Sequence, residues 1–312
     1  MQALNTVYQY RLRKPFVKTC IWLYLKTNSP GLNRLMTVMA GKILNLMDLH
    51  QLETLKEFME ARTALYNQAG FVSTDPISIP HMFTIKEDME ISALLVASIA
   101  WGNRKSILNS GRRLVELMDL RPAAFIQGFT ERDLIPFKGF VHRTFNEFDL
   151  LCFFYSLRNI YENHGGLEAV FSKGGGRSRD IRKALIHFHN VFFEIPHLNR
   201  SRKHLGNPAE GSAAKRINMF LRWMVRRDEN GVDLGLWKAF MASDLYCPLD
   251  VHSGRVARQL GLLSRKQNDW KAVEELTANL RRLDPVDPVK YDFALFGMGV
   301  FEKESPGRMP PF

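Results

Sequence analysis

Two ionisable residues, Lys215 and Asp250, occupy positions from which an amine and a carboxylate could act together. Asp250 lies two residues after Pro248 and opens an amphipathic helix, so its carboxylate lies near the positive end of the helix dipole. A partly desolvated lysine amine can attack an electrophilic sugar carbon and form a Schiff base. The simpler alternatives are an N-cap aspartate and an ordinary surface lysine, and these two residues alone do not decide between the interpretations.

The segment before Lys215 predicts a turn that leads into a helix. Ser212 is a good N-cap residue, and we expect the helix to run from Ala213 to about Arg227. Gly211 and the small residues after it let another backbone approach closely, and the unpaired amides of a helix start bind anions. Lys215 could therefore contact a phosphate or act as a nucleophile.

Three segments resemble parts of the helix-hairpin-helix DNA glycosylases. Residues 211–215 are similar to the hairpin of the bifunctional members, in which the catalytic lysine comes four residues after the first hairpin glycine. Residues 249–261 are similar to the motif that carries their essential aspartate, here Asp250. Residues 97–104 resemble the end of their early buried helix, where a Gln or Asn side chain fills the gap left by an extruded base.

This resemblance implies a DNA repair enzyme that flips a damaged nucleotide out of double-stranded DNA and excises its base. Lys215 would be the catalytic nucleophile, with AP-lyase cleavage by β-elimination, and Asp250 would be the essential carboxylate. The residues implied to bind nucleic acid are Asn103, Arg104, Gly211, Ser212, Arg216, Arg255 and Arg258.

The layout departs from that of most bacterial glycosylases. Ala213 stands at the second hairpin glycine, and 35 residues separate Lys215 from Asp250, nearly twice the usual distance. Archaeal 8-oxoguanine glycosylases have a similarly long separation and an altered hairpin, so they are the nearest analogue in layout, and an oxidised purine is the implied substrate. The cysteines that bind the cluster of endonuclease III-type relatives are absent.

The whole chain is also similar to DUF2400, a bacterial family of proteins of unknown function. Residues 212–226 and 290–297 carry further features of that family. This second resemblance implies no activity. A non-catalytic protein of the same fold that binds DNA or RNA is therefore an alternative to the enzyme, and a purely structural interaction protein is a third interpretation.

Helical periodicity dominates from about residue 48, and alternating strand patterns are scarce. We therefore expect an all-α fold, and the glycosylase resemblance implies two lobes with a cleft between them and a helix-hairpin-helix element. One lobe would hold about residues 111–248, and the other would hold residues 47–110 with 249–312. Residues 131–139 and 143–163 are among the expected helices.

The net charge of +11 and the pI near 9.6 suggest a polyanionic partner. Residues 1–46, however, hold seven Lys or Arg and no Asp or Glu, which leaves only +4 for the rest of the chain. We expect this basic segment to be an extension outside the native fold, with Met47 or a nearby Met as the native start. Its apolar run, residues 19–25, is too short to cross a bilayer.

Cysteine and histidine usage argues against a disulfide scaffold and a metal centre. Cys20, Cys152 and Cys247 are isolated in the sequence, a pattern that suits a reducing cytoplasm. The histidines form no paired ligand motif. We therefore predict a cytoplasmic monomer without a metal, a cofactor or an association with membranes. Its predicted partner is double-stranded DNA with a damaged base, and the sequence does not identify the lesion.

Overall fold

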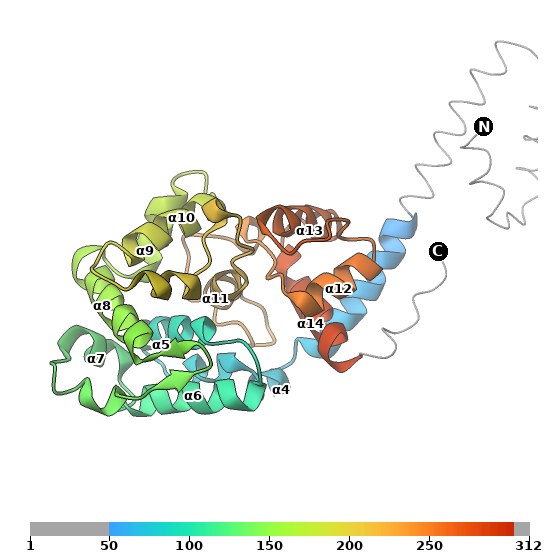
Figure 1. Cartoon of the computed structure of the whole chain (residues 1–312). Coiled ribbons are helices and arrows are strands. Elements are labelled where there is room, and N and C mark those ends of the chain that lie inside the picture. Colours follow the sequence, from blue (N-terminus) through green and yellow to red (C-terminus); the bar gives the residue numbers. More distant parts are fainter. Residues whose placement is uncertain (1–49, 303–312) are drawn as a thin grey trace, which may run out of the picture. The chain divides into compact units, whose positions relative to one another are not determined.

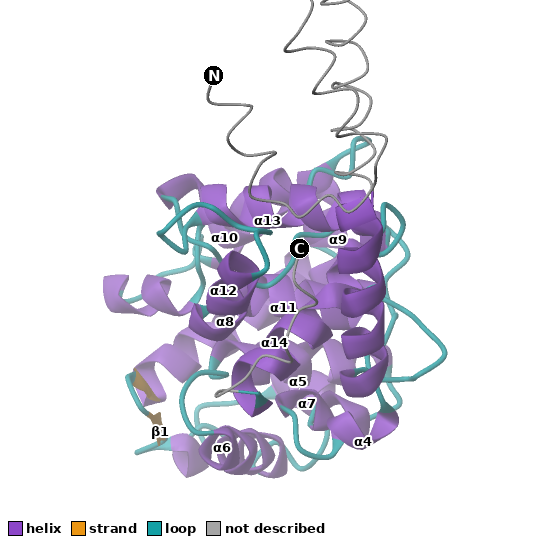
Figure 2. Ribbon diagram, turned by 90° about the vertical axis from the view of Figure 1, so that its right-hand side faces the viewer, coloured by secondary structure: helices purple, strands orange, loops and turns teal. Residues whose placement is uncertain are grey.

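The computed structural model describes residues 50–302, and these residues are predominantly helical (Figures 1 and 2). By its internal contacts the chain divides into residues 1–55 and residues 56–312, and the site described below lies wholly in the second unit. The expected all-α class is therefore confirmed for the described residues. The basic segment 1–46 and the expected start at Met47 lie outside them.

Helices of seven to seventeen residues make up most of the second unit. Residues 50–66 are helical, and the α-helices that follow are α4 (Ala69–Val72), α5 (Lys86–Ser98), α6 (Arg104–Glu116), α7 (Pro122–Gly128), α8 (Glu147–Asn163), α9 (Leu167–Gly175), α10 (Ile181–Phe192), α11 (Lys215–Val225), α12 (Val251–Gln259), α13 (Trp270–Leu283) and α14 (Tyr291–Phe301). The short 3-10 helices are η1 (Pro76–Ser78), η2 (Pro80–Met82), η3 (Ile135–Phe137), η4 (Asn199–His204), η5 (Pro208–Glu210), η6 (Ala242–Asp244) and η7 (Pro288–Lys290). In the described part, no helix is both long enough and apolar enough to cross a bilayer.

Helix α5 lies in the core because its sequence is apolar or small on nearly every side. Ile91, Leu94 and Ala97 are among its fully buried residues, as expected of a helix without a polar face. Helix α11 packs against α5, and α12 packs against α14. Both views place α11 in the middle of the surrounding helices (Figures 1 and 2). The two helices that begin at the candidate residues therefore rest on buried neighbours.

The long segment between α11 and α12 is fixed to α11 by buried ion pairs. Asp233 accepts hydrogen bonds from Arg222 Nε at 3.2 Å and from Arg226 Nη1 at 3.0 Å, and the Asp233 carboxylate is fully buried. The amides of Leu234 and Trp237 donate to carbonyl groups near the end of the helix. These contacts return the chain to the core, so the 35 residues between Lys215 and Asp250 do not hold the two side chains apart.

The expected helices around residues 131–146 are wrong in their boundaries. Residues 131–139 contain only the 3-10 helix η3, since Pro136 and a left-handed Gly139 (φ +73°) do not suit a continuous helix. The next residues form an antiparallel hairpin of β1 (Val141–His142) and β2 (Phe145–Asn146). Helix α8 begins only after Asn146, which forms a capping box with Asp149.

Candidate functional site

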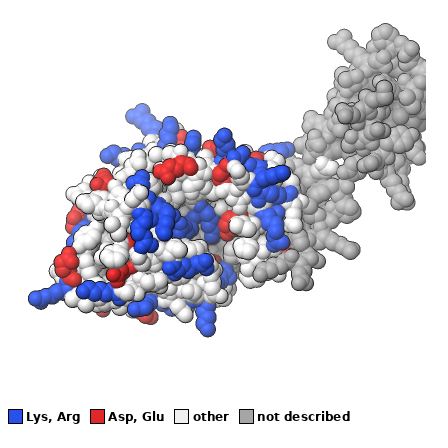
Figure 3. Space-filling view, viewed as in Figure 1, with Lys and Arg blue, Asp and Glu red and all other residues white. Residues whose placement is uncertain are grey.

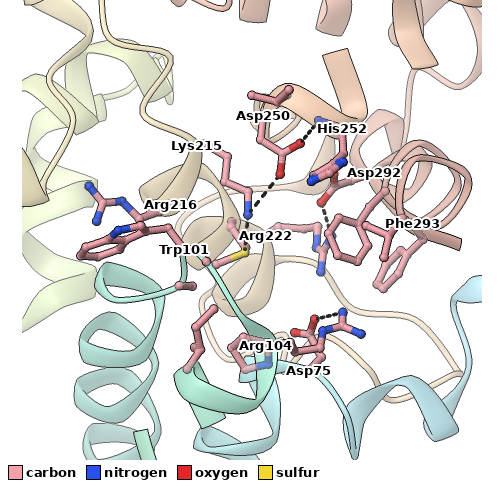
Figure 4. Close-up of a pocket in the computed structure, with 18 of the residues that line it drawn as sticks. Asp75, Trp101, Arg104, Lys215, Arg216, Arg222, Asp250, His252, Asp292 and Phe293 are labelled. Carbon is pink, nitrogen blue, oxygen red and sulfur yellow. Dashed lines mark hydrogen bonds and ion pairs between the residues drawn. The ribbon is translucent and has the colours of Figure 1, made fainter. Parts of the chain in front are cut away.

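Lys215 and Asp250 face each other across the space between the starts of α11 and α12 (Figure 4). Lys215 Nζ lies 3.7 Å from Asp250 Oδ2, and each side chain is 25% exposed. Lys215 Nζ also lies 3.5 Å from the thioether sulfur of Met219, one helical turn further on. The Lys215 amine therefore lies near one carboxylate and one thioether sulfur and is partly accessible to solvent.

The turn before Lys215 differs from the expected cap at Ser212. Helix α11 begins at Lys215 itself, after Ala214 in a left-handed conformation (φ +46°). The Ser212 hydroxyl accepts a hydrogen bond from Ala214 N at 3.2 Å, so Ser212 caps the turn rather than the helix. Gly211 is also left-handed (φ +81°), and its carbonyl accepts from Trp270 N at the start of α13. This turn therefore fixes where the lysine side chain leaves the backbone.

The two oxygens of the Asp250 carboxylate have different partners. Oδ1 accepts hydrogen bonds from His252 N at 2.8 Å and Ser253 N at 3.0 Å, while Ser253 Oγ accepts from Asp250 N, which completes a capping box. Oδ2 faces Lys215. The N-cap interpretation and the reactive-carboxylate interpretation are therefore both compatible with this geometry.

Opposing effects set the pKa of Asp250. Burial of its carboxyl raises the pKa, but the positive charge of Lys215 and the amides of Ser253 and His252 lower it. The net result is a pKa below the usual value, so the carboxylate stays ionised at neutral pH and attracts the positive charge of Lys215.

Lys215 and Asp250 line a cavity of about 700 Å³. Its wall combines aromatic side chains with two further pairs of opposite charge, Arg104 with Asp75 and Arg222 with Asp292. Figure 4 shows these groups pointing toward a common space. The aromatic residues that line the cavity are Phe71, Trp101, Phe293, Phe296 and Phe301.

Arg104 and Arg216, which are both predicted to bind nucleic acid, also line this cavity. Arg104 Nη2 donates to Asp75 Oδ2 at 2.9 Å. Arg216 donates to the carbonyl groups of Ser98 and Lys203, and its guanidinium lies 4.7 Å from the ring centre of Trp101. Burial lowers the pKa of Arg216 to about 10, so it remains a cation at neutral pH.

Two other predicted binding residues have structural contacts away from the cavity. Asn103 caps α6, because its side chain accepts a hydrogen bond from Ser106 N at 3.1 Å. Arg255 Nη2 donates to Gly299 O at 3.1 Å and so ties α12 to α14. Neither residue lines the cavity.

Arg258, Gly211 and Ser212 likewise lie outside the cavity lining. Arg258 donates to the carbonyl groups of Arg265 and Lys266 and to the side chain of Asn268. The structure therefore brings together Lys215 with Asp250, Arg104 and Arg216 from the predicted set, but not the others. The described residues contain no cluster of three or more His, Cys, Asp or Glu side chains that could hold a metal ion.

The sequence was also compared with known proteins. The family described as "Protein of unknown function (DUF2400)" matches residues 75–301, well over half of the chain. The chain belongs to the DUF2400 family. No curated protein and no solved structure matches it. The resemblance to helix-hairpin-helix glycosylases therefore stays a prediction.

Three charged residues that sequence reasoning did not select, Asp75, Arg222 and Asp292, lie in the wall of the site. Burial raises the pKa of Asp292 to about 6, and the positive charges of Arg222 and Lys215 only partly oppose this effect. A signal was present in the sequence, because Asp292 interrupts the aromatic and apolar run of α14. A lone charge within such a run is typical of a paired or functional group.

Proposed function

We propose that the chain is a DNA glycosylase with AP-lyase activity that excises a damaged base, foremost an oxidised purine, from double-stranded DNA. Lys215 is the nucleophile and Asp250 is the essential carboxylate. The observation that carries the proposal is the 3.7 Å separation of Lys215 Nζ and Asp250 Oδ2 in the wall of a cavity of about 700 Å³. The proposal includes a two-lobed, glycosylase-like fold in which the turn before α11 serves as the hairpin.

The chemistry begins with a proton transfer, since an ammonium group cannot attack. In the proposed reaction, Asp250 Oδ2, which lies 3.7 Å from Lys215 Nζ, accepts a proton from the lysine. The amine then forms a bond to the anomeric carbon, while the bond to the base breaks and the base leaves with its electrons. The departing base takes up a proton, which the protonated Asp250 can return.

The covalent adduct explains the lyase step. Opening of the sugar ring gives a Schiff base between Lys215 and the former anomeric carbon. Loss of a proton from the adjacent carbon then expels the 3′ phosphate, which cleaves the strand. Hydrolysis releases the lysine, so no cofactor is needed to balance the reaction.

The cavity and the charges around it suit a nucleotide that has left the duplex. A volume of about 700 Å³ is within the usual range of small-molecule sites and accommodates one base. Figure 3 shows Lys and Arg side chains gathered in the middle of one face and over α12. Cations on such a face can contact the phosphates that flank a flipped nucleotide.

A non-catalytic nucleic-acid-binding protein of the same fold is the alternative. It is favoured by the capping box of Asp250, because a carboxylate that caps a helix can pair with a nearby lysine without taking part in any reaction. The two functions differ in one respect that can be measured directly: only the enzyme forms a covalent bond to DNA.

Borohydride trapping on a duplex with an abasic site tests the proposal. The full chain is expected to form a covalent adduct, Lys215→Ala to form none, and Lys173→Ala, which changes an exposed lysine of α9, to behave as wild type. Salt-dependent binding without an adduct or base release would favour the alternative. Absence of any binding to DNA at low salt would contradict both functions.

A further inference from the structure

We propose that Asp292 and Arg222 form hydrogen bonds with the Watson–Crick edge of the base in this cavity. They would select a base that presents two adjacent N–H donors beside a carbonyl oxygen, as guanine and its oxidation products do. This inference rests on the proposed function, because it concerns the base that Lys215 and Asp250 would release.

The two side chains come from different helices and meet at the cavity wall. Arg222, on α11, and Asp292, on α14, are joined by a hydrogen bond from Nη1 to Oδ2, and both line the same cavity as Lys215. The Asp292 side chain is 10% exposed and that of Arg222 is 5% exposed. Figure 4 shows the pair beside Lys215 and Asp250. A base attached to the sugar at Lys215 would therefore reach them.

Asp292 belongs to a buried charge cluster that contains more carboxylates than guanidinium groups. The cluster joins two guanidinium groups to four carboxylates; its members are Arg222, Arg226, Asp228, Asp233, Asp287 and Asp292. Arg222 already has a carboxylate partner in Asp233, at 3.2 Å.

Asp292 Oδ1 makes no hydrogen bond within residues 50–302. Oδ1 is not among the fully buried atoms without a partner, so it is open to a ligand in the cavity, while burial of the carboxyl group raises the pKa of Asp292 to about 6. A ligand with N–H donors would supply the missing hydrogen bonds.

Guanine-type bases match this pair atom by atom. The ring N1–H and the exocyclic amino group lie side by side and can donate to a carboxylate, while the neighbouring O6 can accept from a guanidinium. An adenine-type edge instead turns the N1 lone pair toward the carboxylate and leaves that oxygen without a donor. A site built on such bonds strongly rejects the analogue that lacks the donor.

Two damaged bases can show whether the protein recognises the ring edge of the base or its oxidised imidazole ring. 8-Oxoguanine and 8-oxoadenine carry the same oxidised imidazole ring and differ at the edge that Asp292 would read. We expect the wild-type chain to excise 8-oxoguanine at least tenfold faster. Asp292→Asn should reduce that ratio at least fivefold, because the amide N–H can donate to N1 of the adenine-type ring. The ratio of the two excision rates is compared, rather than either rate alone, because a general loss of activity lowers both rates together.

A matched control distinguishes base contact from general damage to the cluster. Asp228 pairs with Arg226 in the same cluster, but it does not line the cavity. Asp228→Asn should therefore leave the ratio of the two excision rates unchanged. Equal ratios in wild type and Asp292→Asn would overturn the inference, whereas the proposed function stands or falls with adduct formation by the wild-type chain.

A binding measurement decides the inference even if no adduct forms. Absence of an adduct with the wild-type chain would overturn the proposed function. The melting temperature of the chain is then measured with free 8-oxoguanine and with free 8-oxoadenine. Stabilisation by 8-oxoguanine alone, lost in Asp292→Asn, supports the edge contact, whereas equal effects of the two bases would refute it.

Discussion

The two ends of α11 carry ion pairs of different kinds. At its start, Lys215 lies 3.7 Å from Asp250, and both side chains are a quarter exposed. Towards its end, Arg222 and Arg226 have at most 5% of their side chains exposed and share the fully buried Asp233. The first pair is open to solvent and to a substrate, and the second is enclosed by protein.

This difference separates a pair that can change partner from a pair that stabilises the fold. Exposed ion pairs contribute about 0–1 kcal/mol to stability, whereas loss of one partner from a buried pair costs about 3–5 kcal/mol. The end of α11 therefore holds the chain between α11 and α12 in place, and its start can change partner or protonation state at little cost to the fold.

The largest expected effect comes from breaking the buried end. Asp233→Asn removes the charge that both arginines share, so the free energy of unfolding should fall by about 3–5 kcal/mol, as measured by urea denaturation. Asp228→Asn, at a more exposed carboxylate of the same cluster, should cost less. Equal losses in the two variants would show that burial does not distinguish these positions.

A smaller loss is expected from distorting the turn that presents Lys215. A Cβ atom at Gly206 would lie 2.5 Å from Ser212 Oγ and 2.9 Å from Ala214 Cα, so Gly206→Ala should destabilise the protein by about 1–3 kcal/mol. Adduct trapping should weaken as well, because the lysine would move. Gly70→Ala, with nothing within 4 Å of the new atom, is the control and should leave trapping unchanged.

The contributions of Asp292 and Asp250 to the free energy of unfolding should change with pH in opposite directions. The pKa of Asp292 is raised from its usual 3.8 to about 6 by burial, which Arg222 and Lys215 oppose and Asp250 and Asp233 reinforce. The folded chain therefore keeps a proton that the unfolded chain has lost, and the stability that this proton supplies declines as pH rises from about 4 to about 6.

The measurement is the free energy of unfolding of wild type relative to Asp292→Asn between pH 4 and pH 7. Relative to the variant, wild type should lose about 2 kcal/mol over that range. Asp250→Asn serves as the comparison of opposite sign, since the pKa of Asp250 is lowered. Parallel curves for wild type and Asp292→Asn would contradict the assignment.

The smallest change in stability is expected at the start of α11. Lys215→Met removes the exposed charge and keeps the length of the side chain, so the free energy of unfolding should change by less than about 1 kcal/mol. Covalent trapping should nevertheless disappear. A loss of stability as large as that of Asp233→Asn would mean that the two ends of the helix are not different in kind.

Features that depend on short stretches of sequence, such as helical periodicity and helix starts, could be predicted from the sequence. The all-α class follows from helical periodicity, and the helix start at Asp250 follows from the preceding proline and the basic, amphipathic segment after it. The glycosylase resemblance paired Lys215 with Asp250, and the structure places the two side chains together.

Contacts between distant segments were beyond such reasoning. Seventy residues separate Arg222 from Asp292, and no local pattern shows that a charge on one helix meets a charge on another. The turn before Lys215 was misjudged because Ser212 is a favourable cap on composition alone, whereas the left-handed Ala214 depends on tertiary contacts. The predicted helix 143–163 includes the second strand of the hairpin, because Phe145 continues the spacing of the apolar residues in α8.

The separate partners of the two Asp250 oxygens have a consequence for the proposed catalysis. Because two backbone amides donate to Oδ1, rotation of the carboxyl plane would break these hydrogen bonds, and Oδ2 keeps its direction toward Lys215. In the proposed enzyme, the entropic cost of orienting this group would be met during folding rather than at each turnover. Helix α12 would then serve as a preorganised support for the carboxylate.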